Sequence, residues 1–267
     1  MFWINGQPQQ HLPLDDRAIQ FGDGFFTTAR INQGRIEHLP YHMERLIDTA
    51  KLLLFTTVDW SSLIQEMLRF AELQQEGALK VIISRGSGGR GYSPAGCTEP
   101  VRILSHRPIP AEYATWRDEG VMLAKSPVRL GRSSMLAGVK HLNRLEQVMI
   151  RAYLDRQTEA QEALVLDDEC NVIECCAANI FWRTGDDVFT PDLRFAGVAG
   201  IMRNHILHLL RGSPFDVHMG EAFMYQIKEA DEVIICNALM PVLPVNRIDE
   251  QCYTGARTLF DFISPNC

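Results

Sequence analysis

Residues 138–148 read GVKHLNRLEQV and place a lysine, Lys140, where the character of the chain changes. After it, apolar side chains recur at the 3.6-residue period of an amphipathic helix, at Leu142, Leu145, Met149 and Ala152. A lysine at the start of a helix is commonly solvated. Gly138 permits close approach of the backbone, however, and a lysine amine that apolar neighbours desolvate is left uncharged. Lys140 is therefore a candidate nucleophile for Schiff-base chemistry.

The composition is that of an ordinary globular protein, with 267 residues, 46% hydrophobic and 22% charged. This length exceeds one typical domain and predicts two domains. A net charge of −7 argues against binding to nucleic acid or to an anionic membrane surface. No apolar run approaches the roughly 20 residues that span a bilayer, and MFWINGQPQQ lacks the pattern of a signal peptide. We expect a cytoplasmic protein.

The seven cysteines are odd in number and include no C-x-x-C spacing. In a chain long enough to fold without disulfides, we expect reduced and mostly buried thiols. His38 and His42 are spaced as i, i+4, but no acidic base or third ligand accompanies them. We therefore expect no metal site.

Strand and helix patterns mix in both halves and predict two α+β or α/β lobes with mixed sheets. We expect a smaller N-terminal domain over residues 1–107, an interdomain linker over 108–120, and a larger C-terminal domain over 121–267 that carries Lys140. The linker is predicted because two prolines and then charged residues occur there. A hairpin turn is predicted at Asn32-Gln33-Gly34, and two amphipathic helices follow, one beginning near Pro40 and the other covering residues 60–75.

A lysine that binds pyridoxal phosphate needs an acid to keep the pyridine nitrogen protonated and a cradle for the phosphate. Glu174 begins ECCAANIFW, whose small side chains would let a flat ring approach the backbone. Gly200 and Ile201 lie at a predicted helix N-terminus, where free N–H groups suit phosphate, and Arg45 could bind the same anion bidentately. Each feature also has an ordinary structural interpretation: an edge glutamate, a plain helix start and a solvated arginine.

Taken in order, these motifs resemble the fold-type IV pyridoxal-phosphate enzymes, the family of branched-chain and D-amino-acid aminotransferases and aminodeoxychorismate lyase. The shared stretches are DRAIQFGDGFF, HMERL, SRGSGGRGYS, GVKHLNRL, ECCAANIFW, AGIMR and CNALMPVLPV. The similarity is strongest to the bacterial lyases, particularly in SRGSGGRGYS, SPVRLGR, AGVKHLNRLEQV and ECCAANIFW. The resemblance implies a two-domain architecture with mixed sheets, pyridoxal 5'-phosphate at the domain seam, and a homodimer.

The resemblance also implies roles for individual residues. Lys140 would carry the cofactor and move protons, and Glu174 would pair with the pyridine nitrogen. The phosphate would be bound by Arg45, by the backbone turn Gly200-Ile201-Met202, and by the loop at Asn237 and Ala238. Related aminotransferases commonly place a threonine hydroxyl in that loop, whereas CNALM has none. A backbone N–H or Asn237 would have to replace it.

Three departures from the aminotransferase patterns favour a lyase. Phe26 stands where the D-amino-acid enzymes have a tyrosine, and Arg90 and Tyr92 stand where they have an arginine and a histidine two residues apart. Arg144 follows Asn143 where the branched-chain enzymes have an aromatic residue. D-amino acids should accordingly be poor substrates.

The lyase interpretation implies 4-amino-4-deoxychorismate as substrate, with 4-aminobenzoate and pyruvate as products. Lys140 would remove the proton from the amine-bearing carbon, and the enolpyruvyl group would then leave. Either Thr27 or Thr28 could donate a proton to the leaving group; because neighbouring strand residues face opposite ways, only one can, and we favour Thr28. Arg90 with Arg129 or Arg132 would bind the two substrate carboxylates.

Three other functions remain open from the sequence. RGSGGRG resembles a phosphate-binding glycine loop of a nucleotide enzyme, but it lacks the G-K-[ST] ending of a P-loop. A non-catalytic pyridoxal-phosphate carrier would use Lys140 and Glu174 for binding alone. An aminotransferase would need an amino donor and would form the pyridoxamine form of the cofactor.

Overall fold

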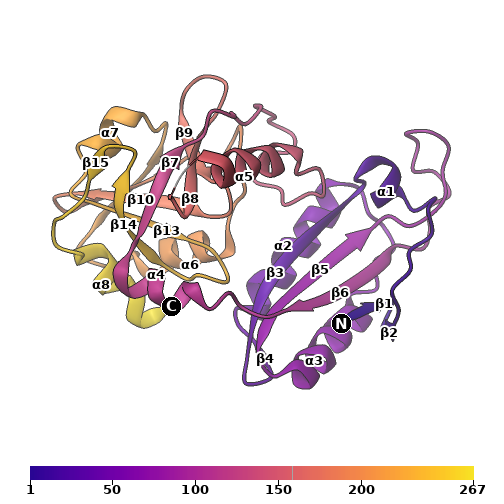
Figure 1. Cartoon of the computed structure of the whole chain (residues 1–267). Helices are drawn as coiled ribbons and strands as arrows, with labels where there is room; N and C mark the ends of the chain where they lie inside the picture. Colours follow the sequence, from indigo (N-terminus) through magenta and orange to yellow (C-terminus); the bar gives the residue numbers. More distant parts are fainter. Residues whose placement is uncertain (158) are drawn as a thin grey trace. The chain divides into compact units, whose positions relative to one another are not determined.

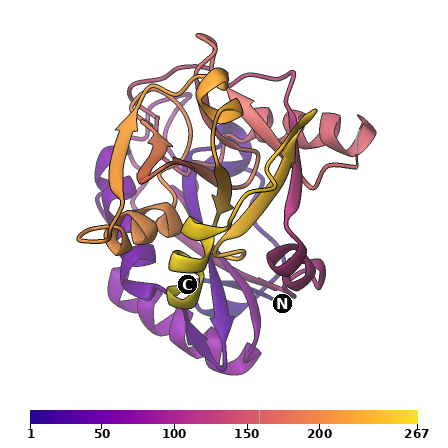
Figure 2. The ribbon, with the colours of Figure 1, turned by 90° about the vertical axis from the view of Figure 1, so that its left-hand side faces the viewer.

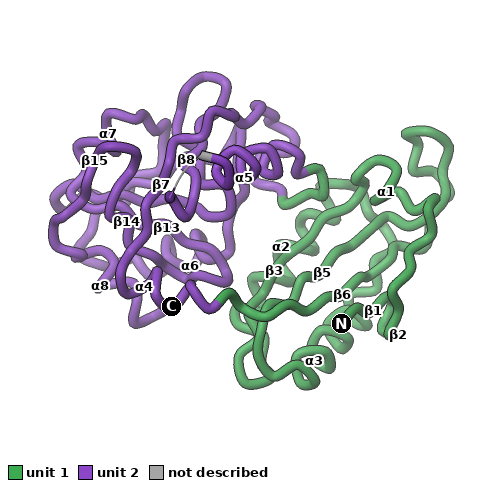
Figure 3. Tube along the Cα trace, viewed as in Figure 1, with its two compact units in different colours: residues 1–110, 140–143 green, residues 111–139, 144–267 purple. Residues whose placement is uncertain are grey.

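The computed structural model describes residues 1–157 and 159–267, drawn in two views in Figures 1 and 2. These residues form two compact units, one made of residues 1–110 and 140–143 and the other of residues 111–139 and 144–267 (Figure 3). Sheets and helices mix in both units, which confirms the predicted fold class.

Unit 1 contains, among the described residues, a six-stranded antiparallel sheet in the order β2-β1-β6-β5-β3-β4. Its strands are β1 (Phe2–Ile4), β2 (Gln7–Pro8), β3 (Gly24–Asn32), β4 (Arg35–Ile36), β5 (Gly77–Ser84) and β6 (Val101–Arg107). Helices α2 (Leu39–Leu52) and α3 (Trp60–Gln74) share one buried apolar cluster with this sheet, and the short helix α1 (Arg17–Phe21) precedes β3. The hydrophobic core of unit 1 lies between these two helices and the sheet.

The two faces of the unit 1 sheet differ in character because side chains alternate along each strand. On β3, Phe25, Thr27, Ala29 and Ile31 are buried, most of them in the cluster shared with α2 and α3. Phe26 and Thr28 therefore point to the opposite face, where Ile82 and Lys80 of β5 are their cross-strand partners. This second face carries the polar side chains of Thr28 and Lys80.

Unit 2 contains a mixed sheet in the order β12-β11-β10-β13-β14-β7-β8-β9, with β15 paired to β14. The pairs β7–β8, β7–β14 and β11–β12 are parallel and the other pairs in the described chain are antiparallel. The strands are β7 (Val121–Lys125), β8 (Glu162–Leu166), β9 (Val172–Cys175), β10 (Asn179–Thr184), β11 (Asp187–Pro191), β12 (Asp216–Gly220), β13 (Glu232–Cys236), β14 (Leu243–Ile248) and β15 (Gln251–Cys252).

Helices accompany this sheet and make its central strands buried on both sides. They are α4 (Glu112–Glu119), α5 (Leu145–Gln157), α6 (Ile201–Leu209), α7 (Met224–Lys228) and α8 (Thr258–Ile263), followed by the 3-10 turn η1 (Ser264–Asn266). On β10, Ile180 and Trp182 join one apolar cluster, whereas Phe181 between them joins another with α6 and α8. Burial on both faces explains why NIFW is apolar without alternation. The C-terminal strands and helix, yellow in Figure 2, can be followed to the end of the chain.

The segment predicted as a linker is helical over most of its length. The two units divide after Pro110, and α4 occupies Glu112–Glu119. Past Pro110 the segment EYATWRDE contains neither proline nor glycine, so nothing in it opposes helix formation. The helix ends at Gly120, whose φ of 87° is accessible to glycine at little cost.

Helix α5 differs from the pattern predicted after Lys140. It begins at Leu145 rather than near Leu142, and it buries Ile150 and Leu154 against β8. Leu145 is 73% exposed and Met149 is 44% exposed, so the apolar residues of the predicted pattern are not the ones that the helix buries. The reason is that residues 140–143 belong to unit 1 and do not form a first helical turn.

The local predictions for unit 1 are confirmed. Asn32 pairs with Arg35 across a two-residue hairpin turn, in which Gln33 and Gly34 have φ values of 49° and 74°. Two positive φ values are the requirement of the type I′ turn that fits the twist of a hairpin. Helix α2 has Pro40 in its first turn; of the residues predicted to face inward, Met43, Leu46 and Ala50 are buried and Ile47 is half-buried.

The thiols are less buried than predicted. All seven cysteines are free; Cys175 and Cys236 are buried, Cys170 and Cys252 are exposed, and the rest are intermediate. The expectation of mostly buried thiols was therefore wrong. No helix within the described part of the chain combines the length and the apolar character needed to cross a membrane.

Candidate active site

Lys140 is held against β3 by backbone pairing within unit 1. The N–H of Phe26 donates to the carbonyl of Lys140 (2.9 Å), and the N–H of Leu142 donates to the carbonyl of Gly24 (3.0 Å). His141 forms an antiparallel bridge with Phe25. These contacts make residues 140–142 a short additional strand beside the start of β3. The Lys140 Nζ lies 4.8 Å from the centroid of the Phe26 ring.

The glycines of FGDG make this close approach possible. A Cβ at Gly24 would overlap the carbonyl of Ile83 and would lie 2.8 Å from a methyl group of Leu142. Gly22 has a φ of 62°, and a Cβ there would overlap the side chain of Asn143, whose Nδ2 donates to the Gly22 carbonyl (3.1 Å). Larger residues at these two positions would therefore displace the segment that carries Lys140.

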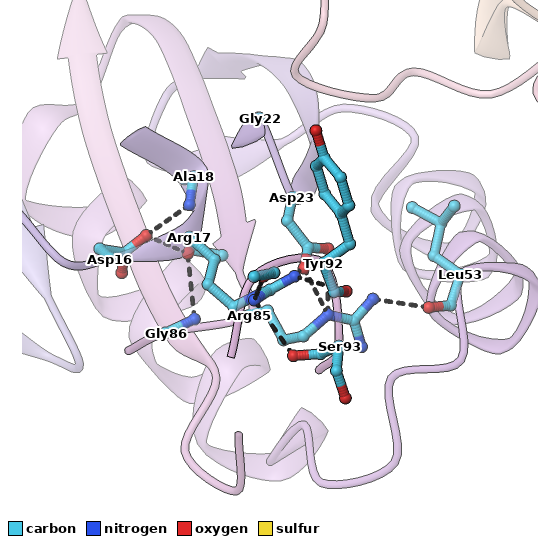
Figure 4. A network of polar contacts seen from close by, with 12 residues as sticks. Asp16, Arg17, Ala18, Gly22, Asp23, Leu53, Arg85, Gly86, Tyr92 and Ser93 are labelled. Atoms are coloured by element: carbon cyan, nitrogen blue, oxygen red, sulfur yellow. Dashed lines mark hydrogen bonds and ion pairs between the residues drawn. The ribbon is translucent and has the colours of Figure 1, made fainter. Parts of the chain in front are cut away.

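A network of buried charges fixes the start of β3 from the other side (Figure 4). Asp23 accepts hydrogen bonds from Nε of Arg17 (2.8 Å) and from Nε of Arg85 (2.8 Å). Burial raises the pKa of the Asp23 carboxyl, but the hydrogen bonds and charges of Arg85 and Arg17 outweigh it and hold that pKa below its usual value. Arg85 also donates to the carbonyls of Leu53 (2.7 Å) and Leu54 (3.1 Å) just beyond α2.

Arg17 extends this network to the glycine-rich loop that carries Arg90 and Tyr92. Its terminal nitrogens donate to three successive carbonyls, those of Gly91 (3.0 Å), Tyr92 (3.1 Å) and Ser93 (3.3 Å). Tyr92 is 87% exposed, and its ring lies 5.5 Å from that of Phe21. The conformation of the loop, and hence the place of both predicted substrate residues, depends on one buried arginine.

The two threonines of β3 face opposite sides of the sheet. Thr27 is fully buried, and its Oγ1 lies 2.6 Å from Nδ1 of the equally buried His42. Burial, with the charge of Arg45 as a further cause, lowers the pKa of His42 to about 3, so its ring is neutral. Thr28 lies on the face that carries Phe26. Of the two candidate proton donors, Thr28 alone lies on the side of Phe26.

Glu174 is buried in unit 2 beside the segment that contains Gly197 and Val198. Its Oε2 accepts a hydrogen bond from the N–H of Val198 (2.8 Å). Gly138 pairs with the residues on either side of Val198, donating to the Gly197 carbonyl (2.9 Å) and accepting from the Ala199 N–H (3.0 Å). A Cβ at Gly197 would lie 2.7 Å from Ile173 and 3.2 Å from the Glu174 carboxylate. The carboxylate is therefore fixed in place by the backbone.

No side chain caps the start of α6. Its N-cap is Gly200, which has no side chain to make a capping bond, and Ile201 and Met202 form the first turn. The first N–H groups of a helix have no partner within the helix and attract anions. A Cβ at Gly200 would overlap Oδ1 of Asn179, whose Nδ2 donates to the Val198 carbonyl (2.9 Å).

Asn237 shapes the loop that follows β13. Its Oδ1 accepts from the N–H groups of Leu239 and Met240 (2.8 Å each), and its Nδ2 donates to the carbonyl of Ala177 (2.9 Å). Cys236, the preceding residue, pairs with Asn179 of β10. Asn179 thus connects this loop to Val198 and to the start of α6. Because the Asn237 side chain is committed to the turn, the backbone N–H of Ala238 is the better substitute for the missing threonine.

Arg129 and Arg132, the other arginines predicted to bind substrate, lie in unit 2. Arg132 forms ion pairs with Asp167 (3.4 Å) and Glu169, and its guanidinium lies over the ring of Phe195. Arg129 donates to the carbonyl of Asp168 (3.3 Å). Both arginines therefore have partners within unit 2.

Arg45 lies on α2. In the part of the chain that the structure describes, no cluster of potential metal ligands occurs. One polar residue that the motifs did not indicate, Lys80, lies on the sheet face of Phe26. Its sequence signal is a single lysine inside the apolar strand ALKVIIS.

Residues 24–248 match the model of a protein family described as amino-transferase class IV. The chain belongs to this family. It is 41% identical over 248 residues to an aminodeoxychorismate lyase of Vibrio harveyi, covering 93% of this chain and 91% of that protein. The structure resembles that of a 4-amino-4-deoxychorismate lyase from Pseudomonas aeruginosa with a TM-score of 0.93 and 34% identity, over 99% of this chain and 97% of that one.

A second solved structure shares the fold at low identity. It is a hypothetical aminotransferase from Mycobacterium tuberculosis in its PLP-bound form, with a TM-score of 0.86 and 18% identity over 99% of this chain and 97% of that one. The family membership confirms the resemblance found in the sequence.

Replacing Asp23 by asparagine should destabilise the protein by about 2 to 3 kcal/mol, because two buried arginines would lose their charged partner. The pKa of Asp23 is lowered from its ordinary value of 3.8. Its contribution should therefore be complete well above pH 4 and should disappear as the pH falls through the lowered value. Urea unfolding of both proteins at pH 7 and near pH 3 measures this difference.

The matched control is Asp48→Asn. Asp48 pairs with Lys51 on the surface of α2, with both side chains exposed, so its loss should change stability by well under about 1 kcal/mol. Equal effects of the two substitutions at pH 7 would show that the Arg17–Asp23–Arg85 network is not a structural support.

Proposed function

We propose that this chain is a pyridoxal-phosphate-dependent 4-amino-4-deoxychorismate lyase that forms 4-aminobenzoate and pyruvate, a step of folate biosynthesis. The observation that carries the proposal is its 41% identity, over 93% of its length, to an enzyme named for that activity. The high structural similarity to a second lyase supports it.

The residues present fit the cofactor. Glu174 offers a buried carboxylate for the pyridine nitrogen, and the backbone that fixes it leads on to the uncovered N-terminus of α6. Gly200, Ile201 and Met202, together with the N–H of Ala238 and the guanidinium of Arg45, would bind the phosphate. Bound in this way, pyridoxal phosphate supplies an electron sink for the carbon that loses a proton.

The chain's own residues would perform the proton transfers. The Lys140 amine would remove the proton from the amine-bearing carbon of the ring. The C–O bond to the enolpyruvyl group then breaks and the ring becomes aromatic. The Thr28 hydroxyl donates a proton to the departing oxygen, and tautomerisation gives pyruvate. Aromatisation makes this direction strongly favourable, so no second substrate is needed.

The proposal includes a cytoplasmic homodimer, on the strength of the family resemblance. An apolar strip on α5 supports it: Leu145, Val148 and Met149 are spaced as i, i+3 and i+4 and are 73%, 60% and 44% exposed. Exposed apolar strips of this kind are typical of subunit contacts. Light scattering should give twice the 30.3 kDa of the chain.

An assay without an amino donor tests the proposed reaction. Purified, cofactor-loaded protein mixed with 4-amino-4-deoxychorismate should release equal amounts of 4-aminobenzoate, followed by fluorescence, and pyruvate, followed by coupled reduction to lactate. An aminotransferase, the main alternative, would transfer the amine of one substrate molecule to its cofactor. It would then stop, with the cofactor left in its pyridoxamine form. Loaded protein that releases neither product would contradict the lyase assignment.

Thr28→Val should lower kcat by about 10²-fold or more, because it removes the proton donor and keeps the shape of the side chain. The matched variant is Thr27→Val on the opposite face of β3. It should lose about 1 to 3 kcal/mol of stability, since His42 loses its buried partner, and should keep kcat. Steady-state kinetics and urea unfolding of both variants distinguish the roles. The reverse pattern would assign the proton donor to Thr27.

A further inference from the structure

The ring of Phe26 lies next to the side-chain nitrogens of two lysines. The Nζ of Lys140 is 4.8 Å from the ring centroid, and the Nζ of Lys80 is 4.6 Å from it. Both distances are within the range of favourable cation–π contacts. All three residues belong to unit 1. Lys80 and Lys140 therefore contact the same aromatic ring.

Lys80 lies on the face of the sheet opposite the core, and its side chain is exposed. It lies on β5, a strand with neighbours on both sides, opposite Thr28 of β3 and Ser105 of β6. Its neighbours in sequence, Leu79 and Val81, are fully buried on the other face of the sheet. The side chain keeps contact with solvent, yet its surroundings desolvate the ammonium enough to lower the pKa of Lys80.

The other strongly held cations of unit 1 have acidic partners. Arg17 and Arg85 share Asp23, and Arg102 pairs with Glu66 at 2.6 Å. No carboxylate of the described residues lies within ion-pair distance of Lys80. A partly desolvated ammonium with no carboxylate partner is suited to an anionic ligand.

We propose that Lys80 binds the carboxylate of the enolpyruvyl group of the substrate. This proposal rests on the proposed function, because it assigns a residue to one of the two carboxylates of 4-amino-4-deoxychorismate. It adds a cation to Arg90, Arg129 and Arg132, which the sequence motifs suggested for the same task.

The position of Thr28 decides which carboxylate Lys80 binds. Thr28 donates to the ether oxygen in the proposed reaction, and the enolpyruvyl carboxylate is attached to the carbon next to that oxygen. Directly opposed residues on antiparallel strands have Cβ atoms about 5 Å apart, and Thr28 and Lys80 are such a pair. The ring carboxylate lies at the far end of the ring, para to the amine that bonds to the cofactor, and therefore points away from this pair.

Lys80→Met tests the proposal, since methionine keeps an unbranched apolar side chain over Phe26 and removes the charge. The enolpyruvyl carboxylate is charged in both the bound substrate and the transition state, so KM should rise by about 10- to 100-fold with kcat changed by less than about 3-fold. Lys80→Arg should restore most of the affinity. The matched control is Lys51→Met on the exposed surface of α2, which should leave both constants unchanged.

Product inhibition identifies the carboxylate. The inhibition constant of pyruvate, which retains the enolpyruvyl carboxylate, should rise in Lys80→Met by a factor similar to that of KM. The inhibition constant of 4-aminobenzoate, which retains the ring carboxylate, should not change. An increase for 4-aminobenzoate alone would overturn the assignment to the enolpyruvyl carboxylate.

Two further results would contradict the proposal in distinguishable ways. An unchanged KM in Lys80→Met, with wild-type protein turning over the substrate, would reject the role of Lys80 and leave the lyase intact. A wild-type protein without turnover would reject the lyase and with it the substrate on which the role of Lys80 depends. The visible absorption of the bound cofactor, measured in every variant, verifies that a loss of affinity is not a loss of folding.

Discussion

The pairing of residues 140–142 with the start of β3 is the constraint on which the candidate site depends. It consists of two backbone hydrogen bonds, which enclose the Phe25–His141 bridge, and it joins a segment from the second half of the sequence to the N-terminal unit. Two glycines, Gly22 and Gly24, leave the space that it needs. The hydrogen bonds of Arg17 and Arg85 to Asp23 then fix the start of β3. These contacts fix the backbone from which the Lys140 side chain extends.

The charged groups of unit 1 divide into those that support the fold and those that serve a ligand. Arg17 and Arg85 satisfy most of their donors with Asp23 and with backbone carbonyls, so they act as structural crosslinks. Lys80 and Thr28 instead lie beside one another on the opposite face from the core, with Phe26 next to them. One sheet thereby separates a supporting face from a reactive face, and the alternation of side chains along β3 makes that separation possible.

Much of the fold could be predicted from the sequence wherever local chemistry decides the structure. Gln33-Gly34 gives the hairpin turn because both positions accept a positive φ, and the apolar period of α2 identifies its buried side. Helix α5 could not be predicted in this way. The pairing of residues 140–142 with β3 is a contact between segments far apart in sequence, and it delays the start of the helix to Leu145. Helix α4 was not predicted within the expected linker, because Pro108 and Pro110 outweighed the helix-favouring residues after them in the interpretation of the sequence.

The candidate site shows the same division. Lys140, Glu174 and Gly200 lie in stretches that resemble a family, so the sequence alone was enough to propose their roles. The role proposed for Lys80 could not be predicted, because a single lysine in a strand forms no motif. That role depends on Thr28, its partner on the neighbouring strand. The choice between Thr27 and Thr28 likewise depended on which face of β3 meets His42.

Identification of the lysine that bonds to the cofactor tests this account most directly. The protein loaded with pyridoxal phosphate would be reduced with borohydride, digested, and its peptides sequenced by mass spectrometry. We predict that the phosphopyridoxyl group is found on Lys140, since that amine is fixed over Phe26 by the pairing with β3. A label on Lys80, or one spread over several lysines, would contradict the account.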